Sequence, residues 1–297
     1  MALTLTSPYT DSPHWLRGNL HAHTTVSDGV CPPEEVIADY ERRGYDFLAI
    51  SDHDKFVPPG EYQRRTRMTL IGGVETSAHG PHILHVDAQA VVEPVRDRQA
   101  VLDAIQRQGG FAVLNHPNWQ AHFDHFPQAM MERLEGYAGV EVYNGVIERL
   151  EGSALATDRW DRLLGMGRRV WGFAHDDSHR PGDVGLAWNV AQSEDRGAEA
   201  IVLALRQGRF YASTGVTIQG VSVEGTTIRV RAEDAQRIRF ISRLGVIRAT
   251  VDSPEAAFSL PEDEEEARKL SYVRAECYGI GGRCAWTQPI FITRLTQ

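Results

Sequence analysis

The feature of this 297-residue chain that most constrains its fold is where its histidines and acidic residues fall. They stand at or just after the ends of short apolar runs that are typical of β-strands. The residues in question are His21, His23, Asp28, His53, Glu75, His116, Asp177 and His179. A parallel β/α barrel gathers its functional groups at the carboxyl ends of successive strands. The pattern therefore predicts a polynuclear metal site at the mouth of such a barrel.

Residues 18–210 alternate apolar runs with amphipathic, helix-like segments. The clearest helix is predicted over residues 32–43, where two prolines suit the start and Gly44 suits the exit. Further helices are predicted over residues 95–108, 127–136, 154–166 and 197–207. Alternation of this kind is typical of a parallel sheet with crossover helices, so the pattern predicts the α/β class.

The pattern of apolar and polar residues changes after about residue 215, where strict alternation and glycine turns replace the helical pattern. We expect a first domain over residues 1–215 and a small antiparallel β-sandwich domain over residues 216–297. The acidic stretch 261–268 is expected to be a solvated loop.

Composition limits the classes of function. The net charge of −9 argues against extended nucleic-acid binding. The N-terminal residues have no secretory pattern, and no apolar run has the length of a membrane span. Three cysteines without a CxxC pair favour reduced thiols. We therefore expect a cytoplasmic protein without membrane contact. The sequence leaves its oligomeric state open.

The histidines are spaced as metal ligands often are. His21 and His23 are two residues apart, which points both imidazoles to one side of an extended segment. Asp28 follows in a Ser-Asp-Gly turn, within reach of a second metal. His53 lies between Asp52 and Asp54, which either accept the second N–H of a ligating imidazole or cap the following helix.

Later strand ends supply the remaining candidates. Glu75 is expected to bridge two cations, because a carboxylate has two oxygens. The segment HGPHILHV offers His82 or His85, and the spacing does not choose between them. His116 precedes a proline, which predicts an extended backbone there. Asp177 and His179 close the series, and mixed imidazole and carboxylate ligands suit Zn²⁺, Fe²⁺ or Mn²⁺.

Taken together and in order, HAHT…SDG, SDHD, GVE, NHP and DDSH resemble the polymerase-and-histidinol-phosphatase (PHP) family of metal-dependent phosphoesterases. The match runs from about Asn19 to His179. The continuation GRFYASTG and the β tail ending in CAWTQPIF resemble a two-domain PHP-like subgroup. The resemblance implies a distorted, TIM-like barrel of seven β/α units that holds two or three divalent metal ions.

The resemblance also implies how the ligands are shared. His21, His23, Glu75 and Asp177 would bind the first metal. Glu75 would reach a second metal with His116 and, by the family pattern, His82. Asp28, His53 and His179 would bind a third, although family members often carry histidine at the position of Asp28.

The expected function is hydrolysis of a phosphoester of a small molecule or nucleotide through a metal-bound hydroxide. Glu75, Asp177 and His179 would be catalytic, and Asn144, His175 and Arg180 would contact substrate. The alternatives are that Asn144 is a turn residue and that Arg180 is an ordinary surface arginine. His122 and His125 are expected to be loop or pocket-wall residues.

Two alternatives remain. The same cluster could cleave a carboxyl ester or carbamate, which an apolar rim formed by residues such as Trp119, Phe123 and Phe126 would favour. The chain could also be a non-catalytic, metal-containing binding module.

Overall fold

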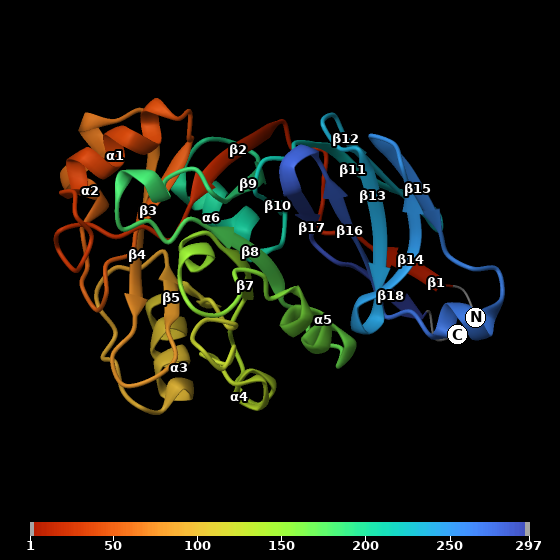
Figure 1. Cartoon of the computed structure of the whole chain (residues 1–297), viewed down its shortest axis with the longest axis horizontal. Helices are drawn as coiled ribbons and strands as arrows, with labels where there is room; N and C mark the ends of the chain where they lie inside the picture. The colour runs from red at the N-terminus through yellow and green to blue at the C-terminus, as the bar shows by residue number, and fades with distance from the viewer. Residues whose placement is uncertain (1–2, 295–297) are drawn as a thin grey trace.

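The computed structural model describes residues 3–294, which form a mixed α/β part followed by an antiparallel β part (Figure 1). In chain order the α/β part contains β2 (His14–Asn19), α1 (Pro33–Arg42), β3 (Phe47–Ile50), α2 (Pro59–Tyr62), β4 (Thr69–Thr76), β5 (Ile83–Val86), α3 (Arg98–Gln108), β6 (Phe111–Leu114), α4 (Gln128–Arg133), β7 (Gly139–Asn144), α5 (Thr157–Gly165), β8 (Trp171–His175), β9 (Trp188–Ser193), α6 (Ala198–Arg206) and β10 (Phe210–Ser213). Each predicted helix has a counterpart, and the structure adds the short helix α2.

The helix ends follow local chemistry. Pro33 begins α1, and Glu34 and Glu35 lie in its first turn, at the positive end of the helix dipole. The Asp97 side chain caps α3 by accepting from the Gln99 and Ala100 amides. Gly109 ends α3 with a φ of 88°, a left-handed backbone that glycine adopts without strain.

The strands of the α/β part lie in one mixed sheet. Their order is β10-β9-β2-β3-β4-β5-β6-β7-β8. The pairs β2–β3, β3–β4, β6–β7 and β7–β8 are parallel, whereas β5 is antiparallel to both of its neighbours. The prediction of a parallel sheet is therefore wrong at β5, and also at β9, which is antiparallel to β2 and to β10. The segment between β4 and β5 is too short for the crossover that a parallel pair requires, which takes about a dozen residues.

The β part consists of two packed sheets. β11 (Ile218–Glu224), β12 (Thr227–Ala232) and β15 (Glu255–Ser259) form one sheet. β13 (Arg237–Ser242), β14 (Val246–Val251), β16 (Tyr272–Tyr278), β17 (Cys284–Thr287) and β18 (Ile290–Arg294) join the other. Buried side chains such as Ile228, Val230, Phe240 and Val273 fill the space between them, as in a sandwich. The acidic stretch is not all loop, because it contains the short helix α7 (Glu264–Arg268).

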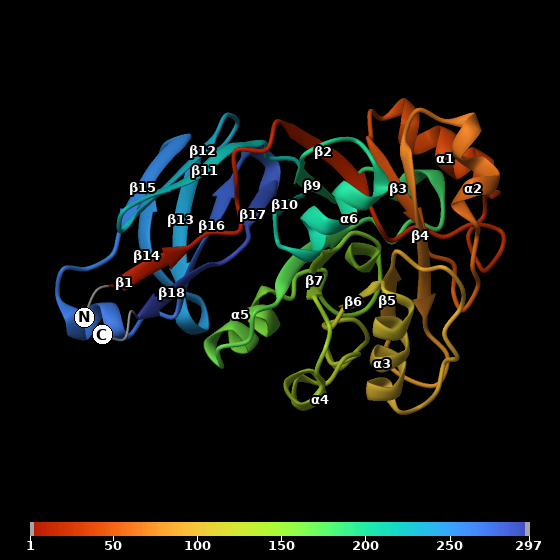
Figure 2. The ribbon, with the colours of Figure 1, turned by 180° about the vertical axis from the view of Figure 1, so that it is seen from behind.

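The α/β part and the β part share strand pairs and a buried ion pair, which the change in sequence pattern near residue 215 does not predict. The first strand, β1 (Leu3–Thr6), pairs with β18 and therefore lies among the C-terminal strands (Figure 2). β10 pairs with β17, so one sheet runs through both parts. Arg274 of β16 makes a buried bidentate pair with Asp161 of α5, with nitrogen–oxygen distances of 2.9 and 2.7 Å.

Two further findings concern the expectations from composition. None of the helices in the described part of the chain is long and apolar enough to cross a membrane. Cys31, Cys277 and Cys284 are all free thiols.

Candidate metal centre

Glu75, at the end of β4, lies at the centre of the candidate site. Its carboxylate is fully buried and is surrounded by imidazole nitrogens. The closest nitrogen–oxygen distances are 2.8 Å to His53, 3.1 Å to His82, 3.1 Å to His116, 3.2 Å to His21 and 3.5 Å to His23. Asn115 also donates to it at 2.7 Å. The structure thus brings five histidines from four chain segments to one carboxylate.

Asp177 faces the same histidines from the segment that follows β8. Its Oδ1 lies 3.2 Å from His21 Nε2, 3.1 Å from His23 Nε2 and 3.7 Å from His179 Nδ1. Both Glu75 and Asp177 therefore contact His21 and His23, which the two-residue spacing places side by side after β2.

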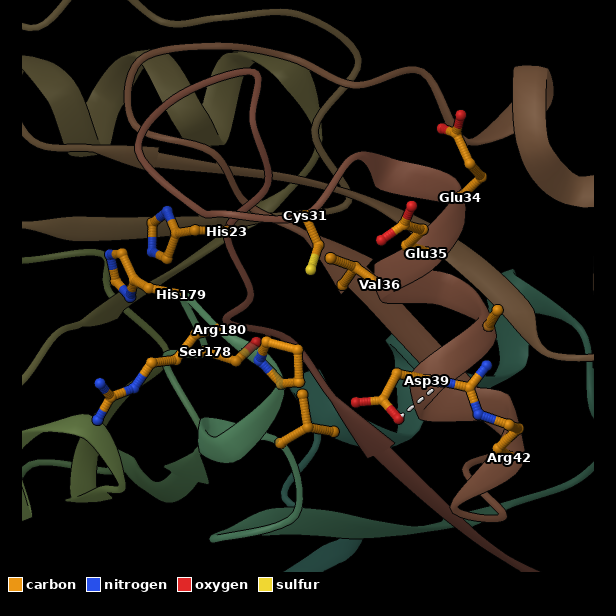
Figure 3. A pocket seen from close by; sticks show the side chains of 13 residues that line it. His23, Cys31, Glu34, Glu35, Val36, Asp39, Arg42, Ser178, His179 and Arg180 are labelled. Atoms are coloured by element: carbon orange, nitrogen blue, oxygen red, sulfur yellow. Dashed lines mark hydrogen bonds and ion pairs between the residues drawn. The ribbon is translucent and has the colours of Figure 1, made fainter.

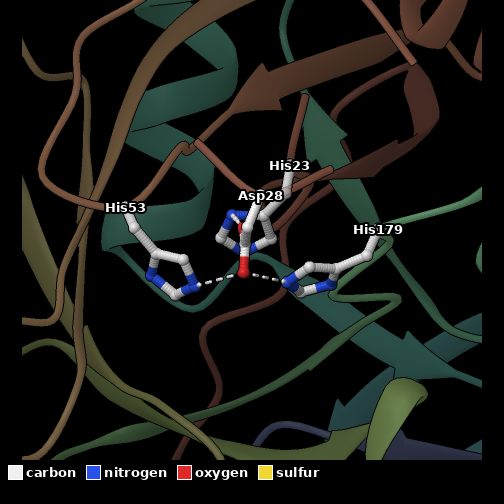
Figure 4. Close-up of side chains that lie close together, drawn as sticks. All are labelled: His23, Asp28, His53 and His179. Carbon is white, nitrogen blue, oxygen red and sulfur yellow. Dashed lines mark ion pairs between the residues drawn. The ribbon is translucent and has the colours of Figure 1, made fainter. Parts of the chain in front are cut away.

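A third group lies at the outer edge of the site, where Asp28 stands among three imidazoles (Figure 4). Its carboxylate lies 3.8 Å from His23, 3.6 Å from His53 and 3.5 Å from His179. The Asp28 side chain is 55% exposed, unlike the buried Glu75. This group is the most open part of the centre.

Many polar atoms of the centre are buried and approach one another closely without the geometry of a hydrogen bond. They include His21 Nε2, both ring nitrogens of His23, His53 Nδ1, Glu75 Oε2, His116 Nδ1 and Asp177 Oδ1. Such atoms are costly to bury unsatisfied, and native proteins satisfy nearly all of them. Several sets of three or four donor atoms also lie within 4.8 Å of one another. The residues present therefore suit bound divalent cations.

The electrostatics agree with this interpretation. Burial opposes ionisation of Glu75, yet the His21 and His82 imidazoles hold the pKa of that carboxyl well below its ordinary value. Burial alone would lower the pKa of His53, but Glu75 and Asp28 raise it to about 9. The carboxylates thus favour positive charge among the imidazoles, whether protons or cations supply it.

The structure distinguishes the two candidates on and before β5. His82 lies against Glu75, whereas His85 points away from it and packs beside Gly110. His85 is fully buried, neither ring nitrogen has a hydrogen-bond partner, and burial lowers its pKa to about 4. His85 therefore packs in the core, and His82 is the histidine of this segment that faces the centre.

Two candidate ligands have an unusual backbone. His116 has a φ of 27° and Asp177 a φ of 54°, both in the left-handed region. The expectation that the proline would keep His116 extended is therefore wrong. The His116 amide donates to Glu141 at 2.6 Å and its carbonyl accepts from Trp119, and these bonds hold a turn there. Strained backbone of this kind clusters at functional sites.

Asp52 and Asp54 hold loops and make no hydrogen bond to His53. Asp52 accepts from the amides and hydroxyls of Thr24 and Ser27, which fixes the loop between His23 and Asp28. Asp54 accepts from Ser77 and from the Ala78 amide, which fixes the chain after β4.

Glu141 on β7 is a member of the centre that the sequence did not single out. It is buried, and its Oε1 accepts from Nδ1 of both His21 and His175 at 2.7 Å. Its Oε2 accepts from the His116 amide and from Asn144 at 2.9 Å. The sequence did contain a signal for Glu141, because an acidic residue inside the apolar run VEV is unusual for a buried strand.

Of the three predicted substrate contacts, Asn144 and His175 lie within the metal centre and Arg180 lies outside it. Asn144 donates to Glu141 and, at 3.2 Å, to Asp177, so it belongs to the polar network of the centre, as does His175. Arg180 pairs with Asp183 and lines a separate pocket of about 390 Å³ behind His23 and His179 (Figure 3).

The pocket over the centre has a volume of about 340 Å³. Its lining includes Asp28, His53, Glu75, His82, His116, Asp177 and His179. The remaining wall consists of Trp119, Val146, Ile147, Arg149 and Leu150. Most of the predicted ligands thus face one cavity. His125 is on the loop after His116 and does not line this cavity; its ring lies 4.6 Å from the His82 ring and 4.8 Å from the His116 ring, and its Nε2 accepts from the His82 amide at 3.1 Å. Its donor atoms group with those of His82 and His116.

Comparison with known proteins supports the fold. No protein-family model matches the chain, and no curated protein matches its sequence. A solved structure from Bacteroides vulgatus, a two-domain protein containing a predicted PHP-like metal-dependent phosphoesterase, aligns over 98% of this chain and 90% of its own. The identity is 15% and the TM-score 0.56. At the level of the fold, this likeness confirms the resemblance drawn from the motifs.

Two other solved structures align over 56% of this chain and 88% of their own. One is an amidohydrolase from Chromobacterium violaceum, with 18% identity and a TM-score of 0.41. The other is a putative metal-dependent phosphoesterase from Bifidobacterium adolescentis, with 15% identity and a TM-score of 0.40. These TM-scores are too low to carry an argument about this chain.

Proposed function

We propose that this chain is a metal-dependent hydrolase that cleaves a phosphoester of a small molecule or nucleotide. The observation that carries the proposal is the convergence of unpartnered, buried imidazole and carboxylate atoms around Glu75. A purely structural core would leave those atoms unsatisfied at a cost of about 1–3 kcal/mol each.

The residues that would hold the cations form three overlapping sets. His21, His23, Glu75 and Asp177 would hold the first ion, and Glu75, His82 and His116 the second. Asp28, His53 and His179, with His23 nearby, would hold a third. Mn²⁺, Fe²⁺ and Zn²⁺ suit such mixed ligands. When bound, divalent cations polarise an ester oxygen and activate water near neutral pH.

The protein's own groups prepare the site for that chemistry. Glu75 contacts imidazoles from all three sets of residues, so it would help to set the separation of the ions. The Glu141 carboxylate can only accept, so the His21 Nδ1 that contacts it must carry the proton. The lone pair of His21 Nε2 is thereby directed toward Glu75 and Asp177. His179 and Asp28 lie at the open edge, where a substrate would enter.

We also infer that the mixed sheet closes as a distorted barrel, although β8 ends the strand order without a named partner on its second side. Two links support the inference. The Asn189 side chain of β9 bonds to both the amide and the carbonyl of Ala174 on β8. Beyond β2, Ala22 forms a parallel bridge with Ser178. We also propose that the chain divides into one domain over residues 1–215 and a second over residues 216–297. The strand β1 belongs structurally to the second domain, because it pairs with β18.

A second candidate function is hydrolysis of a carboxyl ester or carbamate on the same cluster. The apolar part of the pocket wall, formed by Trp119, Val146, Ile147 and Leu150, favours it. Arg149 in the same wall favours an anionic ester instead. A non-catalytic module remains the third alternative, and turnover of any ester would exclude it.

The test is a substrate screen of protein reconstituted with Mn²⁺, Fe²⁺ or Zn²⁺, comparing phosphomonoesters, phosphodiesters and carboxyl esters. We expect turnover of a phosphoester. Glu75→Ala should lower kcat by at least about 10²-fold, because it removes the shared ligand. His179→Ala should lower kcat less, with partial rescue by excess metal. Wild-type turnover and metal content in Glu75→Ala would refute the bridging role.

A further inference from the structure

The pocket over the metal centre has one permanently cationic group among the described residues that line it, the guanidinium of Arg149. Arg149 lies at the end of the short 3-10 turn Val146–Arg149, directly after β7. Its side chain is 36% exposed, so it is open to solvent while its position is fixed by a neighbour.

That neighbour is Asp183, whose side chain is 3% exposed. Asp183 accepts from Arg149 Nε at 3.1 Å and from Nη2 at 2.8 Å, a two-point contact that fixes the plane of the guanidinium. These contacts engage two of its five N–H donors. In the described part of the chain, Nη1 has no hydrogen-bond partner. Arg149 therefore has donors left for a ligand in the pocket.

Asp183 also ties Arg149 to the metal centre. It accepts from the backbone amide of His179 at 3.2 Å, so one buried carboxylate orients both the arginine and a candidate ligand. Arg180 binds the same carboxylate through Nε at 3.2 Å, but its side chain is 55% exposed and lines the other pocket. The two arginines share an anchor and differ in the cavity that they face.

The rest of the wall beside Arg149 is apolar. Val146 and Ile147 are buried, Leu150 is 43% exposed, and the ring of Trp119 lies against His82 and His116. The volume of about 340 Å³ is at the lower end of the range for small-molecule sites. The wall thus offers one place for an anion and one for a compact apolar group.

Resting on the proposed function, we infer that Arg149 binds the phosphoryl oxygens of a phosphomonoester whose alcohol part is apolar and packs on Trp119 and Leu150. The arginine supplies a planar fork suited to phosphate, held in place before substrate arrives. The sequence pointed to Arg180 for this role, so the two arginines give opposite predictions.

The first experiment measures binding of inorganic phosphate by calorimetry to Mn²⁺-reconstituted protein, and it needs no turnover. We expect Arg149→Ala to weaken phosphate binding about 10- to 100-fold, the usual range for a hydrogen bond to a charged group. Arg180→Ala should stay within about two-fold of wild type. Metal content and thermal unfolding of each variant show that the site is intact. Equal losses in the two variants, or a loss only in Arg180→Ala, would overturn the inference.

The second experiment compares 4-nitrophenyl phosphate with 4-nitrophenyl acetate, which share the leaving group and differ in charge. Arg149→Ala should lower kcat/KM for the phosphate about 10- to 100-fold and leave the acetate within about two-fold. Leu150→Ser should lower kcat/KM about 3- to 10-fold for 4-nitrophenyl phosphate and leave glycerol phosphate unchanged, because one partly buried leucine contact is lost.

Failure of the two proposals can be told apart. If wild-type protein cleaves no ester, the proposed function fails, while the phosphate titration still decides the role of Arg149. If wild-type protein cleaves phosphomonoesters and Arg149→Ala does so equally well, only the inference fails. A preference for bis(4-nitrophenyl) phosphate over the monoester would overturn the substrate class.

Discussion

Replacing Glu141 with glutamine tests how the centre is held, because the change removes a charge with almost no change in shape. Glu141 accepts four hydrogen bonds, from His21, His175, the His116 amide and Asn144. Although burial opposes ionisation, His21 and His175 hold its pKa well below the ordinary value. The carboxylate is therefore charged at neutral pH.

Glutamine can accept at one oxygen only, and its NH₂ group would face two of the four donors. Losing two charge-assisted hydrogen bonds at about 1.5–3 kcal/mol each predicts a fall of about 3–6 kcal/mol in the free energy of unfolding. The His21 ring would also lose the partner that keeps the proton on Nδ1. Changes of this kind behind a ligand usually weaken metal binding about 10- to 100-fold.

The assay is calorimetric titration of Mn²⁺ or Zn²⁺ into chelator-treated protein, together with denaturant unfolding. The exposed Glu151→Gln serves as the charge-matched control and should behave as wild type. Glu141→Gln with wild-type metal affinity would show that this carboxylate does not orient the ligands, and the reasoning about His21 would fail.

Other predictions follow from single features of the structure. Arg274→Ala should lower the free energy of unfolding by about 3–5 kcal/mol in denaturant titrations, because it leaves the buried carboxylate of Asp161 without its cationic partner. The exposed pair of Arg237 with Asp252 should be dispensable, and equal losses of stability on removing either arginine would contradict this prediction. Burial depresses the folded-state pKa of His85 from 6.5 to about 4, so stability is present above pH 6.5 and is lost as pH falls toward 4. Between pH 7 and pH 5 this loss should be about 2 kcal/mol, and it should disappear in His85→Leu when unfolding is measured at both pH values. Mn²⁺ at about 100 times its dissociation constant should raise the free energy of unfolding by about 2.7 kcal/mol per independent site, whereas no rise in melting temperature would argue against binding.

Much of the centre was predictable because its residues lie at strand ends. His21, His53, Glu75 and Asp177 each follow an apolar run, and parallel strands bring such ends together. Glu141 was missed because it lies inside a strand, where a charged residue is normally read as facing solvent. Its partners come from residues far away along the chain, so only the folded chain reveals them.

The errors in the fold have similar causes. Apolar periodicity carries no strand direction, so it does not show that β5 is antiparallel to its neighbours. The pairing of β1 with β18 joins opposite ends of the chain, which no local pattern encodes. The sequence singled out Arg180 because it follows the DDSH motif, and only the position of each side chain around Asp183 shows that Arg149 is the arginine that faces the pocket over the centre.

The central claim is that the cluster around Glu75 binds divalent cations, and elemental analysis of protein purified without chelator tests it most directly. We expect at least two transition-metal ions per chain in wild type and a clear loss of bound metal in Glu75→Ala. A metal content near zero in the wild-type protein, not restored by added Mn²⁺, Fe²⁺ or Zn²⁺, would contradict it.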